Sequence, residues 1–326
     1  MSLQITNLCN SKCTMCGIWK IYRGEDRRLL EGELAGPEWI RLVDRALARG
    51  VESFDVTGGE PFLKEGIADL LALMLRRTGF AAVTTNALQS GRILGAVRKV
   101  LAQAPRDSLF VVSVSLDGFD GTHAAVRGVR HGAARARELL RELGRLRREY
   151  PQLSQQISFT IMEENADEMP ELMAEALRSG LIEEPDDFSF RPVASGHYYA
   201  QSNILENRRK VVRVIDRVQR DHEFRRTLPF VEKMSQSVLE PDRMILPCYA
   251  MFASLWIDPY GGVAPCVTMT GDVIGNVRET DFDILPIWLG HQAQQSRERI
   301  ARDECAVCWT DCQALESIEY ESAGMP

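Results

Sequence analysis

Short apolar runs rich in β-branched residues alternate with longer segments of helical periodicity over the first 195 residues. Six of these runs are predicted to be strands, at residues 3–7, 53–59, 81–86, 109–118, 156–162 and 187–193. Apolar residues recur every three or four positions in five intervening segments, predicted to be helices: 36–50, 67–77, 92–104, 135–150 and 169–180. This alternation favours one parallel sheet with right-handed crossovers. Periodicity alone leaves open whether the sheet is doubly wound or curled toward a barrel.

Residues with reactive or polar side chains follow the carboxyl ends of these predicted strands. The carboxyl ends of parallel strands lie at one edge of the sheet, where α/β proteins bind their ligands. We therefore expect these residues to gather at one site. They are, in chain order, Cys9, Cys13 and Cys16, the stretch 58–61, Asn86, Asp117, residues 163–165, and Arg191.

Composition narrows the class of protein. The chain is 45% hydrophobic, yet no stretch approaches about 20 apolar residues and no basic-then-apolar start is present, so we expect a cytoplasmic protein without a membrane span. A net charge of -7 argues against a nucleic-acid partner. The arginine-rich segment 135–150 does not change this, because Leu139, Leu143 and Leu146 recur at helical spacing and predict a helix with a solvated charged face.

The eight cysteines fall into two groups, separated by 231 residues without cysteine. Such tight spacing in a cytoplasmic protein favours metal binding over disulfides. Zinc is one alternative, but a closed zinc site needs about four ligands, and the first histidine after the N-terminal group is His123. Three thiolates fit an iron–sulfur cluster that leaves one iron open. The groups are Cys9, Cys13 and Cys16, and then Cys248, Cys266, Cys305, Cys308 and Cys312.

The C-x3-C-x2-C spacing after the first strand, together with TGGEP at 57–61 after the second, resembles the radical S-adenosylmethionine (SAM) enzymes. The resemblance covers roughly residues 3–192. It implies an α/β fold, a partial (β/α)6 barrel of the TIM type. It also implies that Cys9, Cys13 and Cys16 hold a [4Fe-4S] cluster whose open iron chelates SAM. In this family, one-electron reduction of SAM yields methionine and a 5′-deoxyadenosyl radical, which abstracts a hydrogen atom from the substrate.

The resemblance assigns roles to residues of the glycine-rich turn and the cysteine loop. Gly58 and Gly59 would let main-chain carbonyls approach the ammonium group of SAM, because neither carries a Cβ. Glu60 is expected to help hold that ammonium group, and Pro61 to stiffen the turn. Met15 is expected near the adenine ring, with plain loop packing as the alternative.

Further SAM contacts are expected along the same edge. Asn86, Ser113, Ser115 and Asp117 are expected to bind the ribose or carboxylate of SAM. Because strand residues alternate between two faces, the last three would share one face. Arg127 is a candidate for the SAM carboxylate, with a surface salt bridge as the alternative.

The second cysteine group resembles the opening of the SPASM and twitch extensions of radical SAM enzymes. Cys248 and Cys266 flank a predicted hairpin with its turn at 259–262 and a C-x12-G-x4-C spacing. A full SPASM domain has seven cysteines for two clusters, whereas this group has five. The resemblance therefore implies one auxiliary [4Fe-4S] cluster, and a zinc ribbon is the alternative. The expected ligands are Cys248, Cys266 and Cys305, with Cys308 or Cys312 as the fourth.

These patterns predict three parts: the barrel at 1–195, a helical connector at 196–245 and the auxiliary-cluster domain at 246–326. The auxiliary cluster is expected to accept an electron from the substrate radical, so we predict an oxidoreductase that modifies a peptide or protein side chain. Arg191 is expected to clamp an anionic or hydroxylated group of the substrate. A flavodoxin or ferredoxin is the expected electron donor.

Two alternatives to this function stay open. One is dehydrogenation of a small molecule such as a sugar or an aminocyclitol. Since eight residues precede Cys9, we expect no leader-peptide recognition domain before it, which weakens the peptide hypothesis without excluding it. The other alternative is a non-catalytic iron–sulfur electron carrier, for which TGGEP beside the cluster would have no evident use.

Overall fold

A computed structural model describes residues 1–22, 30–199, 203–305 and 308–322, without the side chains of residues 311–313 and 322. Six parallel strands form its inner layer, each paired with the next in chain order. They occupy the positions predicted from the sequence, with ends that differ by a few residues. The strands are β1 (Ser2–Gln4), β2 (Asp55–Thr57), β3 (Phe80–Thr85), β4 (Leu109–Ser115), β5 (Leu153–Ile161) and β6 (Phe188–Pro192).

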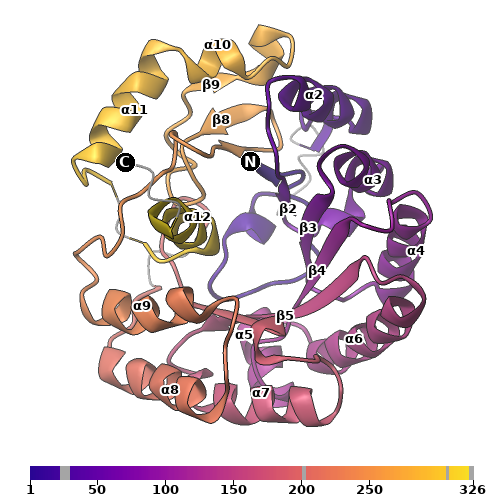
Figure 1. The fold of residues 1–326 in the computed structure, drawn as a ribbon, viewed down its shortest axis with the longest axis vertical. Coiled ribbons are helices and arrows are strands. Elements are labelled where there is room, and N and C mark those ends of the chain that lie inside the picture. The colour runs from indigo at the N-terminus through magenta and orange to yellow at the C-terminus, as the bar shows by residue number, and fades with distance from the viewer. Residues whose placement is uncertain (23–29, 200–202, 306–307, 323–326) are drawn as a thin grey trace.

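Helices cover the outer face of these strands, so the α/β partial barrel expected from the sequence is confirmed (Figure 1). In α6, Leu139, Leu143 and Leu146 are buried against the sheet while Arg141 is exposed, as the amphipathic pattern predicts. Helix α5 was not predicted from the sequence. The helices are α2 (Gly36–Ala48), α3 (Ile67–Thr78), α4 (Ser90–Leu101), α5 (Asp120–Arg127), α6 (Gly132–Glu149) and α7 (Met169–Arg178).

Short 3-10 helices connect several of these elements. They are η1 (Ile18–Lys20), η2 (Pro61–Leu63), η3 (Ala166–Glu168), η4 (Pro185–Asp187) and η5 (Val277–Thr280). The first two lie directly after the cysteine loop and the glycine-rich turn. Within the described residues, no helix has the length and apolar character needed to cross a membrane.

The C-terminal part is built on the barrel sheet. Strand β7 pairs in parallel with β1, and β7, β8 and β9 form an antiparallel meander, so one sheet runs in the order β6-β5-β4-β3-β2-β1-β7-β8-β9. The predicted hairpin is present, although Gly262 belongs to β8 and not to the turn. The three-part domain division remains a prediction. The elements are α8 (Arg208–Asp221), α9 (Leu228–Leu239), β7 (Trp256–Ile257), β8 (Gly262–Ala264), β9 (Gly275–Asn276), α10 (Leu285–Trp288), α11 (His291–Ala301) and α12 (Asp311–Ser322).

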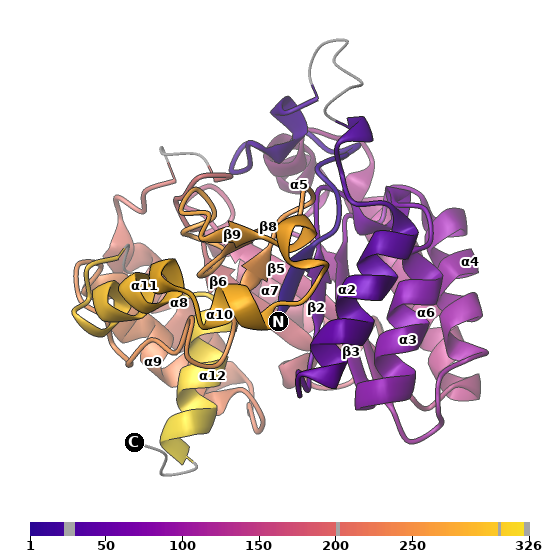
Figure 2. The same ribbon diagram turned by 90° about the horizontal axis from the view of Figure 1, so that it is seen from above.

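The two sides of the molecule differ in what covers the sheet. In Figure 2, α2, α3, α4 and α6 lie on one side, and α8 to α12 lie on the other. Residues that face the outer helices, such as Leu3, Val56 and Val112, are fully buried and form the main core. Those that face the inside of the barrel are mostly hydroxyl or amide residues, whereas branched apolar side chains usually fill such barrels. They leave a cavity of about 540 Å³ lined by Thr57, Thr84, Ser113, Gln156, Ser158 and Arg191 among others.

Candidate active site

Cys9, Cys13 and Cys16 line a cavity of about 130 Å³ at the carboxyl end of β1. Main-chain hydrogen bonds hold their loop against the end of α5, from the Lys12 amide to the Arg127 carbonyl (3.0 Å) and from Thr14 to Val126 (2.9 Å). A Cβ on Gly128, which has a φ of +66°, would lie 2.5 Å from the Lys12 carbonyl oxygen. A glycine that ends α5 therefore lets the cysteine loop pack closely against that helix.

The glycine-rich turn after β2 packs against the other side of the cysteine loop. A Cβ on Gly58 would lie 2.8 Å from the Thr6 carbonyl oxygen, and one on Gly59 would lie 2.4 Å from that of Leu8. The Glu60 amide donates to the same Leu8 oxygen at 2.8 Å. Both glycines line the cavity, as SAM contact would require. Contact of their carbonyls with the ammonium group of SAM stays a prediction. The close approach seen here is to the cysteine loop.

Glu60 is directed into the protein and is not among the residues that line the cavity. Its carboxylate accepts hydrogen bonds from the Phe62 amide (3.2 Å), the Thr85 hydroxyl (2.9 Å) and the Asn86 amide (2.8 Å). Burial raises its pKa to about 7, although these hydrogen bonds favour the charged form. The structure gives Glu60 the task of joining the turn, with Pro61 at the start of η2, to the end of β3. Its contact with the SAM ammonium group is an untested prediction.

Asn86, Ser115 and Met15 line the same cavity as the cysteines. The side-chain Nδ2 of Asn86 donates to Asn10 Oδ1 at 2.8 Å and lies 3.9 Å from Cys9 Sγ, so the end of β3 also contacts the cysteine loop. Met15 is buried and packs with Cys13 and other apolar residues. The positions of these three side chains fit the SAM contacts expected of them, which remain predictions.

Asp117 and Ser113 are not among the residues that line this cavity, and the SAM contacts expected of them stay predictions. Asp117 lies beyond the end of β4, where strand alternation no longer applies, and is fully buried. Its carboxylate pairs with Arg127 and accepts from the Thr160 amide at 2.7 Å. Ser113 lines the larger interior cavity instead.

Arg127 joins this buried carboxylate to the cysteine cavity. Its guanidinium pairs with Asp117, and Nη1 lies 3.8 Å from Cys13 Sγ. Burial opposes the charge on Arg127, but Asp117 and Cys13 outweigh it and raise its pKa above the ordinary value. The surface salt bridge considered as an alternative is therefore replaced by a largely buried pair. A fixed positive charge that lines the cavity suits a carboxylate ligand or a cluster of thiolates.

The three thiols suit a soft metal centre. Burial raises the pKa of Cys9 to about 12 and that of Cys16 to about 11, so both are protonated near neutral pH unless a metal replaces the proton. Thiolates are the preferred ligands of iron–sulfur clusters. The donor set of this cavity thus fits a cluster with three protein ligands.

The cysteine cavity adjoins the larger cavity inside the barrel, since five residues line both. The residues that line both cavities are Thr57, Thr84, Tyr199, Trp256 and Val267. The two threonines could have been found from strand alternation. Nothing in the sequence pointed to Trp256, because its place depends on β7 pairing with β1.

Arg191 lies in the larger cavity, where its Nη2 donates to the Ser158 hydroxyl at 2.8 Å. The only other charged side chains among the described residues that line this cavity are Asp55, Asp186, Arg226 and Glu316. Arg191 is thus placed inside the barrel among hydroxyl groups, and not at the cysteine loop. Its role toward a substrate remains a prediction.

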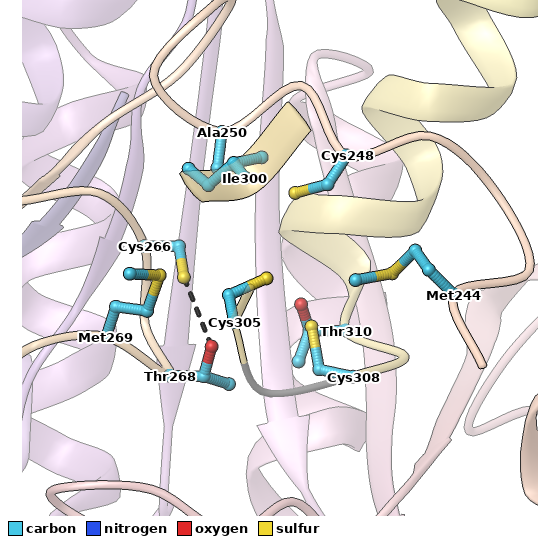
Figure 3. A pocket seen from close by; sticks show the side chains of 10 residues that line it. All are labelled: Met244, Cys248, Ala250, Cys266, Thr268, Met269, Ile300, Cys305, Cys308 and Thr310. Carbon is cyan, nitrogen blue, oxygen red and sulfur yellow. Dashed lines mark hydrogen bonds between the residues drawn. The ribbon is translucent and has the colours of Figure 1, made fainter. Parts of the chain in front are cut away.

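Four cysteines of the C-terminal group line a second, small pocket, and Figure 3 shows their sulfur atoms around a common space. Cys248 precedes β7, Cys266 follows β8, and Cys305 and Cys308 follow α11. Burial raises the pKa of Cys248 to about 12 and also raises that of Cys305. The side chain of Cys312 lies outside the described residues.

Within the described residues, no three Cys, His, Asp or Glu side chains are grouped closely enough to hold one metal ion. A [4Fe-4S] cluster spreads its thiolate ligands over four iron atoms.

Comparison with known families gives two matches on this chain. The model of the radical SAM superfamily matches residues 3–176, more than half of the chain. The model of an iron–sulfur cluster-binding domain, SPASM, matches residues 248–313. These ranges contain the first three and the last five cysteines, respectively.

Relatives are found among curated proteins and solved structures. The chain is 27% identical over 183 residues to the sporulation killing factor maturation protein SkfB of Bacillus subtilis, covering 55% of this chain and 40% of that protein. It is 32% identical over 123 residues to a GTP 3′,8-cyclase of Photorhabdus laumondii, covering 37% of this chain and 34% of that protein. The chain thus spans two fifths or less of the length of these relatives.

The structural matches cover more of the chain. Streptococcus suis SuiB bound to its precursor peptide SuiA has a TM-score of 0.66 at 19% identity, covering 91% of this chain and 65% of that chain. The structure of native anSMEcpe with bound AdoMet and the Cp18Cys peptide has a TM-score of 0.60 at 16% identity, covering 99% of this chain and 96% of that chain. At these identities the likeness shows the fold.

Proposed function

Because this chain belongs to the radical SAM superfamily, we propose that it is an oxidoreductase that modifies a peptide or protein side chain. The chain is a radical SAM enzyme with a SPASM domain, and its cofactors are SAM and iron–sulfur clusters. The observation that carries the proposal is that the three N-terminal cysteines, both glycines of the turn and Arg127 line one cavity, which shares lining residues with the larger cavity inside the barrel.

Each residue of this cavity has a task in the proposal. Cys9, Cys13 and Cys16 would hold the cluster, whose bound SAM supplies, on one-electron reduction, the 5′-deoxyadenosyl radical that abstracts a substrate hydrogen. Arg127 would balance the negative charge of the thiolates or of the SAM carboxylate. Asp117 keeps the Arg127 guanidinium in place from the side away from the cavity.

The second cysteine site would take up an electron from the substrate. Cys248, Cys266, Cys305 and Cys308 line one pocket, so we propose them as ligands of one auxiliary cluster, with Cys312 as an alternative fourth ligand. Full ligation by four thiolates favours electron acceptance over substrate binding at an open iron. Loss of one hydrogen atom, one electron and one proton then gives a net two-electron oxidation of the substrate.

Two observations support a peptide substrate. The cavity inside the barrel, about 540 Å³, has room for a side chain with its flanking backbone, and its hydroxyl and amide lining can pair with peptide groups. Solved structures of similar fold include SuiB bound to a precursor peptide and anSMEcpe bound to peptides. Arg191 would hold an anionic or hydroxylated group of the substrate, and a flavodoxin or ferredoxin would supply the first electron.

The first experiment tests SAM cleavage. Protein prepared without oxygen and given dithionite and SAM should form 5′-deoxyadenosine, and Cys13→Ala should abolish this while leaving the auxiliary cluster in place. Lack of 5′-deoxyadenosine from the unchanged protein would favour an electron carrier.

A second experiment tests the substrate class. Candidate peptides, sugars and aminocyclitols are incubated with the enzyme, dithionite and SAM, and mass spectrometry follows the loss of two hydrogen atoms. Loss from a peptide in step with 5′-deoxyadenosine supports the proposal. Loss from a sugar or aminocyclitol, with none from the peptides, contradicts it.

A further inference from the structure

A buried carboxylate, Glu33, fixes the main chain that leads into the cysteine loop. It precedes α2, and its side chain has no exposed surface. Its Oε1 accepts hydrogen bonds from the Asn7 amide at 2.6 Å and the Thr6 hydroxyl at 3.0 Å. Asn7 stands two residues before Cys9. Lys64, the residue directly after η2, donates to Glu33 Oε2 at 2.9 Å and balances the charge of the carboxylate.

The same carboxylate is linked to the C-terminal hairpin through two tyrosines. The Tyr22 hydroxyl donates to Glu33 Oε1 at 2.7 Å, and the Tyr22 and Tyr260 hydroxyl oxygens lie 3.0 Å apart. Since the Tyr22 proton is used for Glu33, Tyr260 must donate to Tyr22. Beside this pair, the Leu34 amide donates to the Pro259 carbonyl at 2.6 Å. Tyr260 and Pro259 lie in the turn between β7 and β8.

Hydrogen bonds to a buried charge are stronger than those between neutral groups, so this network holds its members firmly. The Thr6 hydroxyl that donates to Glu33 also accepts from the Leu8 amide at 3.0 Å. The conformation of residues 6–8 therefore depends on the position of Glu33. The position of Glu33 itself depends on Lys64, which follows η2, and on Tyr260 of the C-terminal hairpin, which acts through Tyr22.

We propose that Glu33 is a positioning residue for the SAM-binding cluster, and that Tyr260 makes the C-terminal domain part of this support. The inference rests on the proposal that Cys9, Cys13 and Cys16 bind that cluster. Docking of the hairpin beside β1 then does more than extend the sheet, because it also helps to set the geometry of the loop that carries the first cysteine.

Hydrogen exchange on the apo-protein tests this directly, in Glu33→Ala, Glu33→Gln and Tyr260→Phe. Glu33→Ala should speed exchange of the amides of residues 5–9 by about tenfold or more, because the Asn7 amide loses its acceptor. Glu33→Gln should retain part of the protection. Tyr260→Phe should speed the same amides by about threefold, because the remaining contacts of Glu33 persist.

Glu38→Ala is the matched control. Glu38 lies on the same segment and pairs with Arg278 of the C-terminal part at 3.1 Å, but its described partners do not include the cysteine loop. Its removal should leave exchange at residues 5–9 unchanged.

A spectroscopic reading on the reconstituted full chain completes the test. Electron paramagnetic resonance of the reduced N-terminal cluster with SAM should be altered in Glu33→Ala and in Tyr260→Phe, and unaltered in Glu38→Ala. Unchanged exchange at residues 5–9 in Glu33→Ala overturns the proposal. If Glu33→Ala unfolds globally, Tyr260→Phe decides, and unchanged exchange there overturns the link to the C-terminal domain. Failure of SAM cleavage in the unchanged protein would refute the proposed function. The exchange measurement on the apo-protein would still show whether Glu33 and Tyr260 hold residues 5–9.

Discussion

Replacing Gly59 by alanine tests whether the glycine-rich turn supports the cysteine loop. The new Cβ would lie 2.4 Å from the Leu8 carbonyl oxygen, 2.6 Å from its carbon and 2.8 Å from the Asn7 carbonyl oxygen. All three are main-chain atoms, and hydrogen bonds from the turn to the loop hold the chains together at 2.6 and 2.8 Å. Neither side can yield without loss of these bonds. We therefore expect a cost near the upper end of overpacking effects, about 3 kcal/mol.

The assay is urea unfolding of the apo-protein, followed by iron analysis after anaerobic reconstitution. Gly59→Ala should lower the free energy of unfolding and reduce iron at the N-terminal site, because the loop can no longer seat against the turn. Gly95→Ala is the matched control, since nothing lies within 4 Å of its Cβ and it is inside α4. It should stabilise the protein by roughly 0.5–1 kcal/mol. A free energy of unfolding for Gly59→Ala equal to that of the unchanged protein, with full iron content, would refute the reasoning.

Three further predictions concern buried charges and the second cysteine site. Burial lowers the pKa of His123 to about 4, so the unfolded state takes up the proton at a higher pH than the folded state does, and the contribution of His123 to stability should fall by about 2 kcal/mol from about pH 7 to about pH 5. This contribution is measured as the difference between the unchanged protein and His123→Asn, because Glu60, whose pKa is raised to about 7, adds stability as the pH falls over the same range in both proteins. His123→Asn keeps an acceptor for the Asp117 amide and should lack this fall in urea titrations; equal pH dependence in both proteins would contradict the pKa. Arg127→Gln leaves the Asp117 carboxylate buried without its partner and should lower the free energy of unfolding of the apo-protein by about 3 kcal/mol. Adding Asp117→Asn to the same chain should restore most of this loss, and no recovery in the double variant would count against the ion pair. Cys266→Ser should lower iron content to about half while SAM still perturbs the N-terminal cluster spectrum, and unchanged iron would remove Cys266 as a ligand.

The strands and most helices of the barrel could be predicted from the sequence because these elements are local in origin, whereas their closure into a partial barrel was expected only from the resemblance to radical SAM enzymes. An alternation of β-rich runs with amphipathic segments is enough to favour a parallel sheet, and Leu139, Leu143 and Leu146 identify the buried face of α6 without any tertiary information. The cysteine spacings are equally local. They indicated two metal sites before any fold was known.

The contacts of individual side chains at the site could not be predicted from such local patterns. Glu60 and Asp117 stand where ligand-binding carboxylates were expected, yet the Glu60 carboxylate joins the turn to β3 and the Asp117 carboxylate pairs with Arg127. A sequence gives the position of a carboxylate along the chain. It does not show which donors from distant segments will surround it.

By itself, the sequence determined the alternation of strands and helices, the two cysteine groups and the glycines of the turn, because each depends on neighbouring residues or on residue type. Only the tertiary structure decided that β7 joins the sheet beside β1, which brings Trp256 to the cavity and Tyr260 to Glu33. The physical reason is that strand pairing and buried hydrogen bonds between distant segments depend on how whole elements pack, and no short pattern records that choice.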